Sequence, residues 1–204
     1  MMKFTRPKRP GYLDNYKKWG REYAKKKKEY TEKKRKTSPK WNKKIRQWEQ
    51  LKSDLAKLTI DHCSFCDSYP LVAKGQQTIE HFRPRSSYPK LAYVWHNLFL
   101  SCKICQEKGD KFSKKLLKPD VIGYDFYRYF MVNFKTGKIE INTRASKEDQ
   151  ERATITMNVY GLNNHNRSEA RSDYYNRIKH QERKKKIKIS RDIDILSYRF
   201  MFEI

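Results

Sequence analysis

The sequence His62-Cys63-Ser64-Phe65-Cys66 opens a segment that closes with Ser101-Cys102-Lys103-Ile104-Cys105. These two Cys-x-x-Cys pairs contain all four cysteines of the 204-residue chain. Four thiolates at this spacing suit a tetrahedral zinc ion, because each pair can turn two sulfurs toward one point about 2.3 Å away. A shell filled by four cysteines has no position open for substrate, so such an ion is structural. The expected ligands of this structural zinc are Cys63, Cys66, Cys102 and Cys105.

Two further motifs lie between the cysteine pairs, at residues 78–84 (Thr-Ile-Glu-His-Phe-Arg-Pro) and 95–98 (Trp-His-Asn-Leu). The first is typical of a short apolar strand that ends on an adjacent carboxylate and imidazole. We expect strands over residues 78–82 and 97–101, a long loop between them, and a helix over residues 105–112. A zinc clamp would then join the two ends of a segment whose middle carries acid–base groups, which is typical of a functional site.

This segment resembles the HNH endonuclease family, whose fold is a β-hairpin and one helix around a divalent metal. The matching motifs are Cys63-x-x-Cys66, Glu80-His81 with Pro84, Trp95-x-Asn97-Leu98, and Cys102-x-x-Cys105 followed by Lys108. Residues 79–86 (Ile-Glu-His-Phe-Arg-Pro-Arg-Ser) with Tyr88-Pro89 look, more narrowly, like the PtuB-type HNH subunit of Septu and retron-associated anti-phage defence systems. The fold that this resemblance implies is α+β: a ββα-metal core with a four-cysteine zinc site, flanked by basic N- and C-terminal helices and an extra β-hairpin.

The resemblance also implies an activity, the metal-dependent hydrolysis of phosphodiester bonds in nucleic acid. His81 occupies the position of the family's general base, and the unperturbed histidine pKa of about 6.5 suits that role. Asn97 matches the middle asparagine, which braces the loop and helps to orient the histidine. Glu80 matches the acidic ligand of a hard divalent ion, Mg²⁺ or Mn²⁺. Because adjacent side chains alternate along a strand, Glu80 and His81 can share one site only where the strand end is distorted.

The third metal position departs from the family pattern. The family usually places histidine or asparagine directly after the last cysteine, where this chain has Gln106. A glutamine carbonyl can ligate Mg²⁺, although it is one methylene longer, and His96 and Glu107 are alternative ligands.

Three basic side chains near this site are expected to contact the phosphates that flank the scissile bond: Lys108, Arg83 and Arg85. Lys108 has a family counterpart. Arg83 and Arg85 would serve equally well as surface charges on a loop.

The charge of the chain favours a polyanionic partner. Lysine and arginine outnumber the acids 48 to 23, which gives a net charge of +25, and residues 1–50 hold 19 of these bases against 5 acids. Nucleic acid is the foremost polyanion, since each neutralised phosphate releases counterions, although ribosomal and membrane-surface proteins have similar charge. No apolar run approaches the ~18 residues of a membrane span, and the N-terminus lacks an apolar signal core. We therefore expect a cytoplasmic protein with reduced cysteines.

The chain divides into three expected parts. Residues 1–60 form a basic helical extension, residues 61–118 the HNH-like zinc module, and residues 119–204 a β-hairpin with C-terminal helices. In the extension, apolar residues on one face predict a helix over 12–28. A second helix is expected to begin at Ser38-Pro39, with a serine cap and a first-turn proline, and to bury the side chains of Trp41 and Trp48 in the core.

In the C-terminal part, residues 127–134 and 138–142 flank a Lys-Thr-Gly turn and predict a hairpin. Ser146 predicts the start of a helix that stops at Gly161. Beyond Asn163 we expect one or two long helices, and Ser190 is expected to cap the last of them.

Three function classes remain open from sequence. The first is an HNH endonuclease; the second is a zinc-stabilised nucleic-acid-binding module with a decayed site, of which Gln106 would be the sign; the third is a basic scaffold subunit. The resemblance implies as partners nucleic acid, DNA or RNA, and an ABC/SMC-like ATPase subunit of the PtuA type. In retron-linked forms it adds a reverse transcriptase and its DNA.

Overall fold

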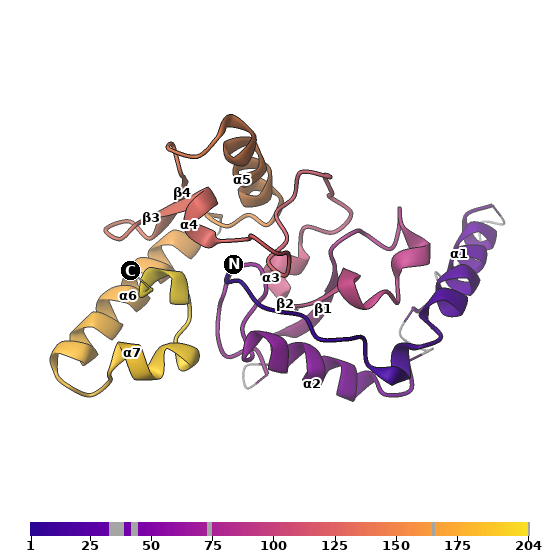
Figure 1. Cartoon of the computed structure of the whole chain (residues 1–204), viewed down its shortest axis with the longest axis horizontal. Helices are drawn as coiled ribbons and strands as arrows, with labels where there is room; N and C mark the ends of the chain where they lie inside the picture. Colours follow the sequence, from indigo (N-terminus) through magenta and orange to yellow (C-terminus); the bar gives the residue numbers. More distant parts are fainter. Residues whose placement is uncertain (33–38, 42–44, 73–74, 165, 204) are drawn as a thin grey trace.

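The computed structural model of the 204-residue chain describes all residues except 33–38, 42–44, 73–74, 165 and 204. It is an α+β structure in which the described strands form two separate two-stranded antiparallel sheets. This confirms the predicted α+β class. Figure 1 shows an elongated molecule with the first sheet near its centre, the lysine-rich N-terminal helix at one end and the long C-terminal helix at the other.

The central sheet pairs β1 (Gln77–His81) with β2 (Leu98–Cys102). Every residue of β2 is buried, because α2 (Trp48–Thr59) packs against it. The connection from β1 to β2 is a long loop that holds two 3₁₀ turns, η3 (Pro89–Leu91) and η4 (Trp95–Asn97). Both strands were predicted, and each lies within one residue of its predicted range.

The helix predicted over residues 105–112 is wrong in its extent. α3 (Lys103–Gln106) is a single turn, which starts directly after β2 because the Sγ of Cys102 accepts a hydrogen bond from the Cys105 N–H. It ends early because Gly109 adopts a left-handed conformation at φ +54°, which a glycine tolerates and a continuing helix does not.

The second helix begins later than predicted. Ser38 lies outside the described residues, but Pro39 and Trp41 are not helical, and α2 starts only at Trp48. The Trp41 carbonyl accepts a hydrogen bond from the Tyr93 hydroxyl at 2.6 Å, a position that a helical N–H would otherwise occupy. Tertiary contacts of Trp41 therefore replace the expected first turns of this helix.

The N-terminal helix is bound tightly to the loop between β1 and β2. A 3₁₀ turn, η1 (Gly11–Leu13), precedes α1 (Tyr16–Glu32), which packs against η3. A Cβ atom at Gly20 would collide with the backbone carbonyl of Lys90, so only glycine permits this approach. The ring of Tyr23 packs edge-on against Tyr93 of the same loop, at 6.2 Å between centroids.

Substituting Gly20 with alanine is therefore expected to destabilise the protein by about 1–3 kcal/mol through overpacking. The sign is diagnostic, because a glycine-to-alanine change inside an unconstrained helix stabilises by roughly 1 kcal/mol. Urea unfolding of Gly20→Ala is the measurement. Gly11→Ala, where the nearest atom to the new Cβ lies 3.8 Å away, is the matched control and should be close to neutral. A Gly20→Ala variant more stable than wild type would contradict this packing.

The C-terminal part contains the predicted hairpin and helices, but the strand predicted over residues 127–134 is too long. Residues Phe126–Tyr129 form the helical turn α4, because the Asp125 carboxylate caps it by accepting the Arg128 N–H. β3 (Phe130–Asn133) pairs with β4 (Lys138–Ile141) across a turn in which Gly137 has φ +66°. The Ser146 Oγ caps α5 (Lys147–Val159) by accepting the Asp149 N–H. The elements in order are α4 (Phe126–Tyr129), β3 (Phe130–Asn133), β4 (Lys138–Ile141), α5 (Lys147–Val159), α6 (Arg167–Arg183), α7 (Ile189–Asp192), η5 (Ile193–Ile195) and η6 (Arg199–Met201).

The predicted cap at Ser190 is wrong. Ser190 lies inside α7, and its N-cap is Lys188. The carboxylate of Asp192 accepts the N–H of this N-cap residue, Lys188, at 2.9 Å, so the side chain that contacts the helix start belongs to Asp192 and not to Ser190.

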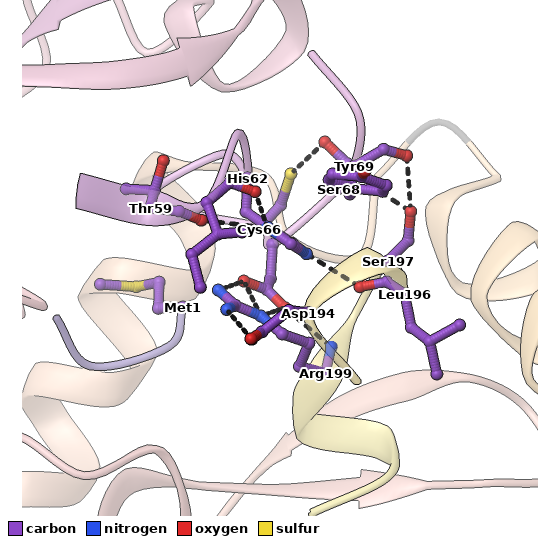
Figure 2. Close-up of polar contacts among 12 residues, drawn as sticks. Met1, Thr59, His62, Cys66, Ser68, Tyr69, Asp194, Leu196, Ser197 and Arg199 are labelled. Carbon is purple, nitrogen blue, oxygen red and sulfur yellow. Dashed lines mark hydrogen bonds and ion pairs between the residues drawn. The ribbon is translucent and has the colours of Figure 1, made fainter. Parts of the chain in front are cut away.

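The C-terminal segment is fastened to the first cysteine pair, as Figure 2 shows. Nε2 of His62 lies 2.9 Å from the Leu196 carbonyl, and the Ser197 hydroxyl contacts the Tyr69 backbone at both its N–H and its carbonyl. Arg199 forms a buried ion pair with Asp67 at 2.7 Å. The chain end and the cysteine segment therefore share one core. Within the described residues, no helix is both long and apolar enough to cross a membrane.

Candidate functional site

The four predicted zinc ligands come together in the fold. Their Sγ atoms all lie within 4.8 Å of one another, and all four side chains are buried. The Sγ atoms of Cys66 and Cys102 are 3.7 Å apart. A tetrahedron with metal–sulfur bonds of about 2.3 Å has edges of about 3.8 Å, so this spacing fits zinc. Among the described residues, this is the one group of three or more His, Cys, Asp or Glu side chains that is gathered closely enough to hold a metal.

The cysteine sulfurs also accept hydrogen bonds from neighbouring N–H groups. The Cys102 N–H donates to the Sγ of Cys63 at 3.4 Å, and Nη2 of Arg167 donates to the Sγ of Cys105 at 3.3 Å. Burial would lower the pKa of Arg167, but the thiolates of Cys105 and Cys66 raise it above its usual value. Four thiolates around Zn²⁺ leave a net charge of about −2, which a buried guanidinium partly neutralises. No local pattern predicts this role of Arg167, since it lies 62 residues beyond the last cysteine.

We expect Arg167→Met to weaken zinc binding by roughly 10- to 100-fold, the usual effect of removing a hydrogen-bond partner of metal ligands. Methionine keeps much of the side-chain volume but cannot donate to sulfur. The measurement is competition for zinc with a chromogenic chelator. Arg183→Met, on the exposed end of the same helix, is the matched control. Equal zinc affinity in the two variants would show that Arg167 has only a packing role.

A cavity of about 270 Å³ at the end of β1 contains the predicted acid–base pair. Glu80 and His81 both line it, although they are adjacent in sequence and both pair in register with β2, so the distorted strand end that a shared site was expected to require is not seen. We call it the His81 pocket; its polar and aromatic lining residues are Trp41, Glu80, His81, Arg85, Gln106 and Asp110.

The environment of His81 fixes its tautomer. Nε2 lies 3.0 Å from the backbone carbonyl of Ala92, and a carbonyl can only accept, so Nε2 carries the hydrogen. In the neutral ring Nδ1 is then unprotonated and able to accept a proton. Burial lowers the pKa of His81 to about 3, which keeps the ring neutral at physiological pH. The ring of Trp41 packs edge-on against the imidazole at 4.5 Å between centroids, so this tryptophan, expected only as a core residue, also contacts the candidate site.

This depressed pKa predicts a pH dependence of stability. The stabilisation is fully present above the unfolded pKa of about 6.5, and it is lost as the pH falls toward the folded value of about 3. Between pH 8 and 5.5 the loss amounts to about 1.4 kcal/mol. His81→Gln removes the titrating group. Between pH 8 and 5.5 its free energy of unfolding should therefore fall by about 1.4 kcal/mol less than that of the wild type. Urea unfolding at both pH values measures the difference, and parallel losses in the two proteins would contradict it.

Asn97 braces the loop that presents the Ala92 carbonyl to His81. Its amide Nδ2 donates to the carbonyls of Arg83 and Leu91, at 3.0 and 3.1 Å, and its Oδ1 accepts the Arg83 N–H at 2.8 Å. The side chain thus ties the two ends of the loop together, and it acts on the imidazole through the backbone.

The carboxylate of Glu80 is already paired. Its Oε1 lies 2.9 Å from Nζ of Lys108, and both side chains are buried. Burial raises the pKa of Glu80 to about 7, against the opposing effect of the Lys108 charge. A metal ion at Glu80 would have to compete with this ammonium. Because Lys108 is also buried, its ammonium contacts Glu80 and does not face the solvent.

The remaining predicted site residues are placed differently. Gln106 lines the His81 pocket, where Nε2 of its amide donates to the Ile79 carbonyl at 3.3 Å. Arg85 lines the same pocket and donates to the Tyr23 hydroxyl at 3.0 Å. Arg83 is exposed, and neither it, His96 nor Glu107 lines this pocket.

One acidic residue of the pocket was missed by sequence reasoning. Asp110 lines it and accepts a hydrogen bond from the Ser86 hydroxyl. It follows Gly109, whose turn returns the chain toward the pocket; a predicted continuous helix concealed this position.

Comparison with known proteins supports one relationship. No protein-family model matches the chain. A stretch of 74 residues is 34% identical to the Septu protein PtuB of Bacillus thuringiensis. The match covers 35% of this chain and 29% of that protein's length. The resemblance to PtuB-type proteins that the motifs predicted is confirmed over this stretch.

Proposed function

We propose that this chain is a metal-dependent HNH-type endonuclease, in which β1, β2 and α3 form the ββα core and a four-cysteine zinc ion holds that core together. The observation that carries the proposal is the state of His81. Its Nδ1 is unprotonated, and its pocket also presents a carboxylate, a guanidinium and an amide. These are the groups that phosphodiester hydrolysis requires: a base for water and charge to stabilise the phosphorane.

In this proposal Nδ1 of His81 accepts the proton of the attacking water. The Ala92 carbonyl, which accepts the Nε2–H, stabilises the imidazolium that forms. The folded pKa of about 3 makes the free histidine a weak base, but a bound phosphate brings negative charge that raises this pKa toward the working pH. Arg85 binds a phosphate oxygen, while Asn97 acts as a positioning residue through the loop backbone.

The oxygen donors of the pocket suit a hard cation, Mg²⁺ or Mn²⁺. Glu80 and Gln106 would hold it, with Asp110 as a further donor on the same pocket. A divalent ion there would supply charge to stabilise the phosphorane and the departing 3′ oxygen. Such an ion would compete with Nζ of Lys108 for Glu80, and an ammonium displaced from Glu80 would be available to a substrate phosphate.

The likeness to PtuB supports a place for this chain in a Septu- or retron-type anti-phage system. As partners we propose a PtuA-type ATPase subunit and nucleic acid, with a retron reverse transcriptase and its DNA in retron contexts. Residues 1–60 and 119–204 would then flank the nuclease module of residues 61–118. Arg83, which is exposed, would contact substrate phosphates beside this module.

A second function, a zinc-stabilised nucleic-acid-binding subunit without activity, is favoured by one observation. The buried Glu80–Lys108 ion pair occupies the expected metal ligand. The experiment that separates the two functions offers plasmid DNA and RNA, with Mg²⁺ or Mn²⁺, to the purified protein with its partner ATPase and to His81→Ala. Cleavage that is lost in the variant supports the enzyme, and equal binding without cleavage supports the binding subunit.

A further inference from the structure

A second cavity, of about 370 Å³, lies where the N-terminal segment and α1 meet η4. We call it the Arg9 cavity; its lining residues are Lys8, Arg9, Tyr16, Val94, Trp95 and His96. None of these residues is acidic. The cavity thus combines two cationic side chains and an imidazole with two aromatic rings, and its volume lies within the range of about 300–1,000 Å³ that small-molecule sites occupy.

Buried contacts hold the floor of the Arg9 cavity in place. The indole N–H of Trp95 donates to the Pro7 carbonyl at 3.2 Å, and Nη1 of Arg6 donates to the Trp95 carbonyl at 3.1 Å. Arg6 is itself fixed by a buried ion pair with Asp120 at 2.7 Å. The extended N-terminal segment is therefore anchored to η4, and the cavity is built into the fold.

At the rim of the Arg9 cavity, a cationic side chain stacks on an aromatic ring. The guanidinium of Arg9 lies over the Tyr16 ring, 4.7 Å from its centroid. Arg9 also pairs with Asp14 at 2.7 Å, but both side chains are substantially exposed, so a phosphate can compete for the guanidinium. Burial, Arg6 and Lys118 lower the pKa of His96, and its neutral ring can donate to and accept from a base edge.

α1 connects this cavity to the His81 pocket. Tyr16 lines the Arg9 cavity, and Tyr23, seven positions later, accepts a hydrogen bond from Arg85 of the His81 pocket. Seven helical residues span roughly 10 Å along the helix axis. The exposed residues of α1 between the two tyrosines include Lys17, Lys18 and Arg21. This stretch of α1 therefore carries three exposed cationic side chains.

We propose that the Arg9 cavity is a nucleotide subsite, which binds a phosphate and a stacked base of the same nucleic-acid strand whose scissile phosphate lies in the His81 pocket. This inference rests on the proposed function. Lys8 and Arg9 bind the phosphate, and the Arg9–Tyr16 stack receives the base. Base–aromatic stacking beside cationic groups is characteristic of proteins that bind single-stranded nucleic acid. An acidic protein partner would use the cationic groups of the cavity but would have no base to stack on the Tyr16 ring.

The test measures binding of fluorescein-labelled oligothymidylates and oligouridylates of graded length by anisotropy, without added Mg²⁺ or Mn²⁺. Lys8→Gln/Arg9→Gln should weaken binding at least about tenfold and reduce the salt slope by about 1.4, the value for two lost single-strand contacts. The matched control Lys184→Gln/Lys186→Gln removes two exposed charges at the far end of α6 and should change binding less than about twofold. Tyr16→Leu should weaken binding about tenfold with an unchanged salt slope. Zinc content and circular dichroism verify that each variant is folded.

Equal losses in the two double variants would overturn the subsite, because they would show a nonspecific effect of net charge. Cavity-dependent binding of poly-glutamate in place of the oligonucleotides would also overturn it and assign the surface to an acidic protein. The result is separable from the proposed nuclease. Cavity-dependent binding without plasmid or RNA cleavage rejects the nuclease alone, and His81-dependent cleavage with unchanged binding in Lys8→Gln/Arg9→Gln rejects the subsite alone.

Discussion

Replacing Cys102 with serine is expected to unfold the cysteine module, so that the variant loses both its zinc and its cooperative unfolding transition. Cys102 is the last residue of β2, and its sulfur also caps α3 by accepting a hydrogen bond from the Cys105 N–H. Structural zinc contributes roughly 10–16 kcal/mol of apparent binding free energy in small peptides. That range equals or exceeds the total stability of a typical domain, about 5–15 kcal/mol. Zinc content by elemental analysis and urea unfolding followed by near-ultraviolet circular dichroism measure the result.

A matched control is available within the first cysteine pair. The hydroxyl of Ser64 is buried without a hydrogen-bond partner among the described residues, and Ser64 lies directly beside Cys63. Ser64→Ala removes an unsatisfied polar atom, so it should retain zinc and be as stable as the wild type or more stable. A Cys102→Ser protein that unfolds cooperatively at the wild-type urea concentration would show that the sulfur cluster does not support the fold.

Elements whose signals are local could be predicted from the sequence. The β3–β4 hairpin follows from the turn at Gly137, and α5 follows from the Ser146 cap. The start of α2 could not be predicted, because the competing interaction is tertiary: the Trp41 carbonyl binds the hydroxyl of Tyr93, 52 residues away. Local capping preference is worth only about 1 kcal/mol, which such contacts readily outweigh.

For the candidate site, the proximity of the chosen residues was more predictable than the environment of each one. The spacing of the four cysteines predicted that they cluster, and they do. The motif predicted that Glu80 and His81 belong to one site, and both line the His81 pocket. The pairing of Lys108 with Glu80 could not be read from sequence, since it depends on α3 ending after one turn. The contact of Arg167 with the Cys105 sulfur depends on how α6 packs, which no local pattern encodes.

Removing the imidazole of His81 is expected to reduce cleavage of plasmid or RNA by at least about 100-fold, the lower end of the usual contribution of a general base. Glu80, Arg85 and Asn97 do not bond to this ring, so His81→Ala should keep the zinc and bind nucleic acid with wild-type affinity. Single-turnover cleavage with Mg²⁺ or Mn²⁺ is the measurement. His180→Ala, an exposed histidine on α6, is the control for loss of a histidine as such.

Imidazole rescue separates a base from a packing residue. The substitution to alanine leaves a space beside Trp41 and the Ala92 carbonyl, where free imidazole can donate to the same carbonyl and present its other nitrogen to water. Cleavage restored in proportion to added imidazole would identify proton acceptance as the role of His81, because a purely structural loss would not respond to a diffusible base. Wild-type cleavage by His81→Ala would refute the proposed mechanism. If neither protein cleaves, equal binding would leave a nucleic-acid-binding subunit, and absent binding a scaffold.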